Sequence, residues 1–218
     1  MVASLEYSVD SLTLLQRDLE KVDNVLSLAP GQIAGLTGVP GSGLTRIGMS
    51  LLVPYAAHGP LVYLDVRGWA NPLAAWEMGI EPERFVVVRS SDIVSWSRIV
   101  ATLLDGARGV YAEVPAGLKD QALFKLAAKA RAKRTPVVFR PVTGKLPAGL
   151  AHLNLDARDV LWEGTEAGHG NLTNRRTLFE ASGKATRGME RMVEVQDDGT
   201  NNLRVVSHMD TQASRRFA

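Results

Sequence analysis

The sequence contains no cysteine and little histidine, and these shortages exclude several kinds of chemistry. Without cysteine the chain cannot form a disulfide framework, a thiolate zinc site, an iron–sulfur cluster or a cysteine nucleophile. Its four histidines leave little for an imidazole metal cluster, so no metal site is expected. What is present is 45% apolar residues in a chain of 218, enough to build a folded domain with a sizeable core.

Long hydrophobic runs and a strong charge bias are also missing. The longest uncharged stretch near the start, residues 47–64, is interrupted by Pro54 and Pro60, so we expect no membrane span. Glu6 and Asp10 stand where a signal peptide would carry Lys or Arg, which favours a cytoplasmic protein. Because 25 basic residues face 23 acidic ones, the net charge of +2 does not by itself indicate nucleic-acid binding.

An apolar stripe at helical spacing lies near the N-terminus. Its members follow one another at intervals of three and four residues: Leu12, Leu15, Leu19, Val22 and Leu26. This pattern predicts an amphipathic helix that ends before Pro30 and Gly31. So narrow a stripe either packs against its own domain or docks on another subunit or partner. We therefore treat residues 1–30 as an N-terminal helix and interaction segment.

From residue 31 onward, short apolar runs alternate with helical stretches. Strands are predicted at 32–37, 61–66, 84–88, 109–114 and 136–140, and helices at 44–57, 72–78, 93–104 and 118–134. This alternation predicts an α/β fold with a mostly parallel sheet flanked by helices. Later strands at 159–162, 177–180, 192–195 and 203–206 predict an antiparallel C-terminal extension. The expected core spans 31–208, with a flexible tail at 209–218.

A glycine-rich segment between the first strand and helix has the spacing of a phosphate-binding loop. Gly38, Gly41, Ser42, Gly43 and Thr45 fit the pattern G-x-x-x-x-G-K-[ST], but Leu44 occupies the lysine position. In a working loop, backbone N–H groups surround the phosphates, lysine reaches the outer ones and the hydroxyl holds Mg²⁺. Leucine cannot neutralise phosphate. The segment is therefore a retained structural turn, a loop that binds ATP without turnover, or an unusual hydrolytic site.

The motifs that follow the glycine-rich segment resemble those of a known family. The second strand ends in Tyr63-Leu64-Asp65-Val66-Arg67, followed by Asn71-Pro72 and Gly79. This order resembles the RecA family, and within it the ImuA accessory proteins of the bacterial mutasome, including their shorter actinobacterial form. The resemblance aligns Arg67 with the family's catalytic glutamate and Glu113 with its magnesium-site aspartate. It implies a RecA-like P-loop core without ATPase activity, with no cofactor required.

The resemblance also implies a role and partners. The expected role is that of a non-catalytic adaptor in DNA-damage-induced mutagenesis by translesion synthesis. It would work with an ImuB-like inactive Y-family polymerase and a DnaE2-like error-prone polymerase. Two alternatives remain open: a divergent RecA-like ATPase that uses another lysine, and a DNA-binding recombination regulator. Because RecA relatives pack an N-terminal helix on the adjacent protomer, the N-terminal stripe could also mediate self-association.

Several further side chains are candidates for contacts with partners. Lys125, Lys129 and Lys133 recur every four residues on one face of the predicted helix at 118–134, as either a solvated face or a contact for DNA or an acidic partner. The loop predicted at 163–176 ends in Arg175 and Arg176, with the same two interpretations. Arg215, Arg216 and Phe217 form a basic, aromatic end that is either frayed or a partner anchor. The tryptophans, Trp69, Trp76, Trp96 and Trp162, are expected to pack in or against the core.

Overall fold

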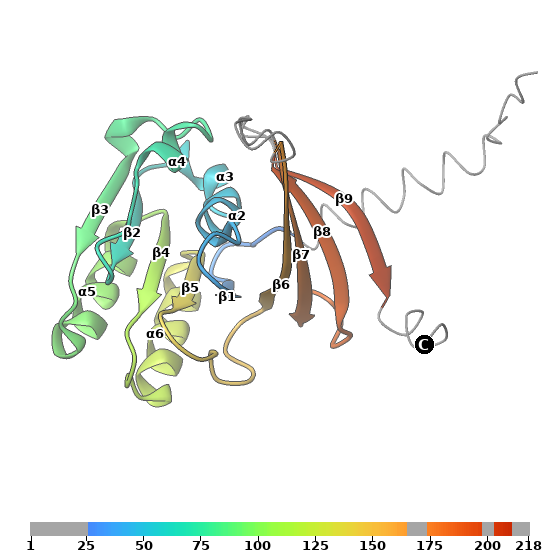
Figure 1. The fold of residues 1–218 in the computed structure, drawn as a ribbon. Coiled ribbons are helices and arrows are strands. Elements are labelled where there is room, and N and C mark those ends of the chain that lie inside the picture. The colour runs from blue at the N-terminus through green and yellow to red at the C-terminus, as the bar shows by residue number, and fades with distance from the viewer. Residues whose placement is uncertain (1–25, 165–173, 198–202, 211–218) are drawn as a thin grey trace, which may run out of the picture.

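The computed structural model describes residues 26–164, 174–197 and 203–210. Within them, nine strands form a single sheet in the order β3-β2-β4-β5-β1-β6-β7-β8-β9 (Figure 1). Six strands are parallel: β1 (Ile33–Thr37), β2 (Leu61–Asp65), β3 (Phe85–Arg89), β4 (Gly109–Val114), β5 (Val137–Pro141) and β6 (Leu153–Glu163). Three antiparallel strands extend the sheet: β7 (Asn174–Gly183), β8 (Arg191–Asp197) and β9 (Leu203–Asp210). The predicted mixed α/β class and the antiparallel extension are confirmed.

Different helices cover the two faces of the parallel part of the sheet. One face carries α2 (Leu44–Ser50), α3 (Val53–Ala56) and α4 (Leu73–Trp76); the other carries α5 (Ile93–Gly106) and α6 (Asp120–Lys133). A short 3₁₀ turn, Pro82–Arg84, precedes β3. Because successive side chains of a strand point to opposite faces, the central strands contribute to both clusters and read as continuous apolar runs.

Proline accounts for the main departure from the predicted helices. The helix expected at 44–57 is two helices, because Pro54 has no N–H to donate to the carbonyl of Ser50. The chain therefore ends α2 at Ser50 and starts α3 at Val53, with Pro54 in the first turn. None of the described helices combines the length and apolar character needed to cross a bilayer.

The late strands are longer than predicted. Strand β6 begins at Leu153, well before the expected start at residue 159, and β9 ends at Asp210. Since β7 begins at Asn174, Arg175 and Arg176 lie in a strand and not in the predicted loop, so that placement was wrong. The pairing of β6 with β7, interrupted by a bulge next to Ala157, supplies the hydrogen bonds that hold this part of the chain extended.

Part of the N-terminal stripe and the basic end fall outside the described residues. These are Leu12, Leu15, Leu19, Val22, Arg215, Arg216 and Phe217, and their roles stay predictions. Leu26 is described: it lies in a turn, not a helix, and packs against the core cluster that contains Leu28. The end of the stripe thus belongs to the protein's own core.

Close packing of α2 on β4 leads to a first prediction. A Cβ on Gly48 would overlap the ring of Tyr111 and lie 2.8 Å from Cδ1 of Leu36. Gly48→Ala should therefore lower the free energy of unfolding by about 1–3 kcal/mol, although alanine favours helices, as urea unfolding would measure. Gly106→Ala is the control in α5: its Cβ meets no atom within 4 Å and should change stability by about 1 kcal/mol or less. Wild-type stability of the Gly48 variant would contradict this packing.

Candidate functional site

The glycine-rich loop lies where the sequence predicted it, between the carboxyl end of β1 and the start of α2. Gly43 adopts a left-handed conformation (φ 77°) and is the N-cap of α2. The Ser42 hydroxyl donates to the carbonyl of Val39 at 2.6 Å, and the Ser42 N–H donates to the same carbonyl at 3.3 Å. The loop thus uses its serine to close its own turn, and Ser42 is fully buried.

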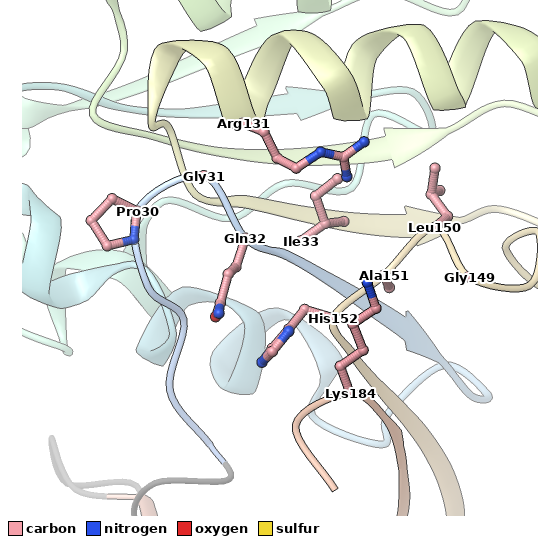
Figure 2. Close-up of a pocket in the computed structure, with 10 residues that line it drawn as sticks. All are labelled: Pro30, Gly31, Gln32, Ile33, Arg131, Gly149, Leu150, Ala151, His152 and Lys184. Carbon is pink, nitrogen blue, oxygen red and sulfur yellow. The ribbon is translucent and has the colours of Figure 1, made fainter. Parts of the chain in front are cut away.

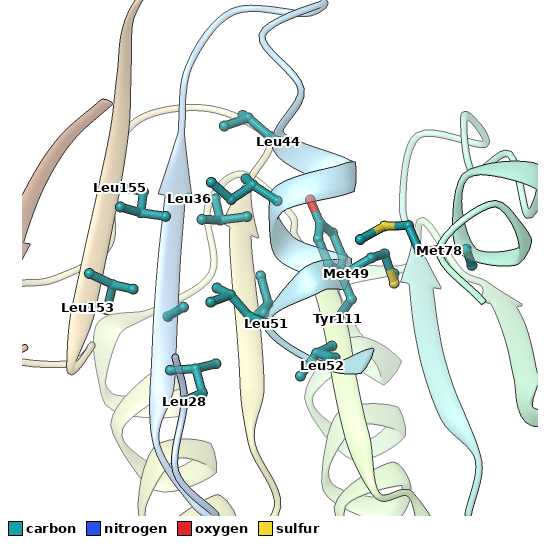
Figure 3. Close-up of a cluster of buried hydrophobic side chains, with 14 of the residues drawn as sticks. Leu28, Leu36, Leu44, Met49, Leu51, Leu52, Met78, Tyr111, Leu153 and Leu155 are labelled. Atoms are coloured by element: carbon teal, nitrogen blue, oxygen red, sulfur yellow. The ribbon is translucent and has the colours of Figure 1, made fainter. Parts of the chain in front are cut away.

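Leu44 completes the core at the position where a phosphate-binding loop has lysine. Its side chain is 2% exposed and belongs to the same apolar cluster as Leu36 and Leu155 (Figure 3). The next residue, Thr45, accepts a hydrogen bond from Nη1 of Arg140 on β5 at 3.4 Å. The hydroxyl that would hold Mg²⁺ in a working loop is therefore contacted by a cation of the protein itself.

Arg175 of β7 covers the other side of the loop. A Cβ on Gly43 would lie 2.7 Å from Cζ of Arg175, so the guanidinium rests directly on the loop backbone. Nη1 of Arg175 also donates to the carbonyl of Gly41 at 3.4 Å, and its Nη2 forms an ion pair with Asp197 of β8. Asp197 receives a second cation, Arg46 of α2, at 3.0 Å. These contacts join the loop to the antiparallel extension.

Glu113, at the end of β4, is completely buried, and β2 and the residues after it supply its hydrogen bonds. Tyr63 donates to Oε1 at 3.1 Å, and the N–H groups of Val66 and Arg67 donate to Oε2 at 3.0 and 3.1 Å. The Arg67 guanidinium donates to Oε1 from Nε at 3.0 Å and also from Nη2. Both carboxylate oxygens are therefore occupied by protein donors.

The electrostatics follow from this arrangement. Burial raises the pKa of the Glu113 carboxyl, but hydrogen bonds from Arg67 and from the backbone outweigh burial and hold the pKa below its ordinary value. Tyr63 and Tyr111 stack with ring centroids 4.5 Å apart. Burial raises the pKa of Tyr111 to about 12 against the opposing charge of Arg140, and burial also raises the pKa of Tyr63. Both phenols stay protonated at neutral pH, so Tyr63 remains a donor to Glu113.

Asp65 shapes the turn that carries Arg67. Its carboxylate accepts three successive backbone N–H groups, those of residues 68–70, at 2.8 to 3.1 Å. Arg89 of β3 contacts the same carboxylate at 3.4 Å. The turn places Trp69 under Arg67, with the guanidinium carbon 4.6 Å from the ring centroid. Arg67 is thus held between Glu113 and an aromatic ring.

Residues 27–144 match the family model described as the MT3502 N-terminal domain. The chain belongs to this family. The matched region runs from before β1 to just after β5, so it contains the glycine-rich loop, Arg67 and Glu113. Arg175 and Asp197, which cover the loop, lie beyond the matched part of the MT3502 N-terminal domain. No curated protein matches the sequence.

Within the MT3502 N-terminal domain, the charged side chains at the carboxyl ends of the strands bind one another. Glu113 has no oxygen free to coordinate a cation, and Asp65 is occupied by backbone donors. Across the described residues, no group of three or more His, Cys, Asp or Glu side chains could hold a metal ion. These contacts connect the end of β2 and the turn after it to the end of β4.

The basic residues proposed as partner contacts also find acidic groups within the chain. Asp105 of α5 receives Lys129 at 2.7 Å and Lys133 at 2.9 Å, and hydrogen bonds from these lysines lower its pKa. Lys125 is exposed beside them. Arg176 contacts Glu163 at 3.0 Å. A contact of these cations with DNA or an acidic partner stays a prediction, and it would compete with the internal pairs.

Sequence reasoning missed two side chains of the site, Arg140 and Asp197. Arg140 had a signal: it is a charged residue at the end of the apolar run 137–139, and a buried strand carries a charge only where a partner exists. Asp197 had none, because it stands at the start of a polar run with the composition of an ordinary turn. Only the pairing of β7 with β8 brings it to Arg175.

The tryptophans divide into buried and exposed groups. Trp96 is fully buried and donates to the carbonyl of Glu113 at 2.8 Å, as the core prediction requires. Trp69, however, is 64% exposed, so its predicted packing was wrong. Leu73 (48% exposed) and Trp76 (43%) of α4 are also exposed, and these three apolar side chains, which are close in sequence, are here called the α4 patch. Leu73 and Trp76 are three residues apart on the helix and face the same side.

The Arg67–Glu113 pair gives a prediction with a pH signature. Arg67→Met leaves a buried, unpaired carboxylate and should lower the free energy of unfolding at pH 7 by about 3 kcal/mol, measured in urea. In the wild type the Glu113 pKa is depressed, so its stabilising effect is present above about pH 4.5 and is lost as pH falls through the folded-state pKa. In the variant that pKa rises above the unfolded value, so the variant's deficit shrinks in acid.

The control for this prediction is Arg89→Met. Arg89 also contacts a buried carboxylate, but it is 67% exposed, and Asp65 keeps its three backbone donors without it. We expect a loss of less than about 1 kcal/mol. A deficit of Arg67→Met that is the same at pH 4 and pH 7 would show that the charge of Glu113 is not what Arg67 stabilises.

Proposed function

We propose that this chain is a catalytically inactive RecA-like accessory protein that binds polymerase-like partners in DNA-damage-induced translesion synthesis. The ion pair between Arg67 and Glu113 carries this proposal. By resemblance, these two positions are those of the base that activates water and of the magnesium carboxylate. In this chain the two side chains neutralise each other. Such a protein acts in the cytoplasm and needs no bound nucleotide.

The topology of the sheet supports a RecA-like core. The connection after β1 runs toward β2 on one side, and the chain after β6 runs toward β7 on the other. In an open α/β sheet, the crevice outside the carboxyl ends of two such strands is the usual ligand site. Here a Cβ on Gly38 would lie 2.7 Å from Cβ of Ala157 on β6, and Arg175 rests on Gly43. Side chains of β6 and β7 therefore contact two glycines of the loop, which supports the proposal that no nucleotide is needed.

The chemistry of the site supports the absence of turnover. ATP hydrolysis needs a group near the attacking water that accepts its proton, and an arginine does not deprotonate in proteins. Glu113 cannot replace that base, because its oxygens already accept hydrogen bonds from Arg67, Tyr63 and the backbone. Leu44 supplies no charge for the phosphates. Three positions, Leu44, Arg67 and Glu113, thus differ from the lysine, glutamate and aspartate that the resemblance to the RecA family would require.

The α4 patch is the surface that best supports partner binding. Trp69, Leu73 and Trp76 expose large apolar side chains at neighbouring positions, and exposed apolar patches mark protein–protein contacts. Tryptophan and arginine are the residues that most often dominate such interfaces, and Arg67 stacks on Trp69 here. We expect this patch to contact the ImuB-like inactive polymerase, which in turn assembles with the DnaE2-like polymerase.

The catalytic part of the proposal is tested by ATP turnover. The purified protein should release phosphate from ATP with Mg²⁺ at the same background rate as its Thr45→Ala variant, because the base and the lysine are both missing. The measurement is steady-state phosphate release at saturating ATP. Sustained hydrolysis by the wild type that disappears in Thr45→Ala would overturn the proposal and favour a divergent ATPase.

The adaptor part is tested by co-purification with an ImuB-like polymerase. Trp69→Ala with Trp76→Ala should weaken the complex by about 30-fold or more, as expected when an aromatic anchor is truncated. Phe124→Ala is the matched control, since Phe124 on α6 is 40% exposed and lies outside the patch. Absence of a wild-type complex would count against the adaptor role. If the double variant binds the polymerase as the wild type does, the α4 patch is not the contact surface, and the adaptor role itself is unaffected.

A further inference from the structure

A hollow of about 250 Å³ lies at the amino end of β1, at the end of the strand opposite to the glycine-rich loop. Its walls come from the turn before β1, the last turn of α6, the residues before β6 and the turn after β7 (Figure 2). None of its lining residues takes part in the contacts of Arg67, Glu113 or Arg175. It is therefore a separate site, which we call the β1-start pocket.

The β1-start pocket is lined by two cationic side chains and an imidazole, which come from three elements. Arg131 comes from α6, His152 from the residues before β6, and Lys184 from the turn after β7. In the described part of the chain, no acidic side chain lines the pocket and none of the three forms an ion pair. Lys129 and Lys133 of α6 differ from Arg131 in this respect, because both pair with the carboxylate of Asp105.

Hydrogen-bond donors dominate the polar lining as well. The side-chain oxygen of Gln32 already accepts the N–H of Ala29 at 2.9 Å, so the amide NH₂ is the group it can offer a ligand. With arginine, lysine and this amide, the pocket presents donors to a molecule that supplies acceptors. Gln32, Arg131, His152 and Lys184 all line the pocket (Figure 2).

The walls are fixed in place by backbone contacts. Gly31 has a positive φ of 83°, and a Cβ there would lie 3.1 Å from the Cα of Arg131, so the end of α6 packs directly on the turn before β1. The His152 N–H donates to the carbonyl of Ile33 at 2.8 Å, and the Ala185 N–H donates to the carbonyl of His152 at 3.0 Å. The backbone segments that carry Arg131, His152 and Lys184 are therefore held together without a ligand.

Like charges that line one hollow repel each other, and an anion bound between them removes this repulsion. We propose that the β1-start pocket binds the terminal phosphate of a small phosphate monoester, with Arg131 and Lys184 as its charge partners and Gln32 as a neutral donor. Such a phosphate carries a charge of about −2 at neutral pH, which balances these two cations, whereas a carboxylate balances one. The hollow accommodates the phosphate with part of its attached group.

His152 provides an internal reporter. Burial, with the nearby charge of Lys184, lowers the pKa of its imidazole. Arg131 and Lys184 are the charged side chains that face it in the pocket, so a bound phosphate would be its first anionic neighbour there. The bound anion should raise the His152 pKa, and the affinity should increase as pH falls through that value.

The test uses the full chain and isothermal titration with inorganic phosphate, ribose 5-phosphate and, as the uncharged comparison, ribose. We expect the two phosphates to bind, ribose to be inert, and the His152 resonances in NMR to shift on binding. Arg131→Gln and Lys184→Gln should each weaken binding about tenfold or more, which is the loss of one charge-assisted hydrogen bond. Lys133→Gln, an exposed cation outside the pocket, is the control and should bind as the wild type does.

A second pair of ligands separates the sources of the phosphate. An oligonucleotide with a 5′-phosphate that binds more tightly than ribose 5-phosphate, and loses this advantage without its 5′-phosphate or in Lys184→Gln, assigns the pocket to a DNA end. Equal or weaker binding assigns it to a free metabolite. Absence of phosphate binding at millimolar concentrations, or equal loss in Lys133→Gln and Lys184→Gln, would overturn the proposal. Neither outcome bears on the proposed polymerase complex, for which the α4 patch is the proposed contact.

Discussion

A fully buried carboxylate must be neutralised, and the ion pair of Glu113 with Arg67 is the constraint around which one end of this sheet is arranged. Glu113 binds the backbone of Val66 and Arg67, so the end of β2 is fixed to β4. Asp65 then folds the following turn around itself and sets Trp69 beneath the arginine. Loss of Arg67 would leave the buried carboxylate of Glu113 without its cation and would also free the turn that leads to α4.

The same pairing determines what this end of the sheet can do. A hydrolytic site keeps a carboxylate open to solvent and metal, and such an open group costs stability because it is only partly solvated. Here each carboxylate is paired or hydrogen-bonded: Asp65 by backbone donors, Glu113 by Arg67 and Asp197 by Arg46 and Arg175. These pairs connect the ends of β2 and β4, the glycine-rich loop and β7 rigidly. Rigidity would suit the docking role that we propose.

The sequence predicted the parts of the fold that depend on local pattern. The strand at 109–114 has the predicted bounds, and α5 and α6 differ from prediction only at their ends, because their apolar periodicity is determined by a single neighbouring surface. The start of β6 was missed, since its register depends on β1 and β7, which are distant in sequence. The altered loop was visible in Leu44. Its cover by Arg175 was not, because a contact between residues so far apart leaves no spacing to detect.

The two ends of β1 differ in how their charged side chains are paired. A net charge of +2 describes the whole chain, but the charges are distributed unequally between the two ends of β1. At the carboxyl end, Arg46, Arg67 and Arg175 each meet a carboxylate, and Arg140 contacts the Thr45 hydroxyl. At the amino end, Arg131 and Lys184 face a hollow that no acidic side chain lines among the described residues. The proposed phosphate site therefore lies at the end of β1 opposite to the glycine-rich loop.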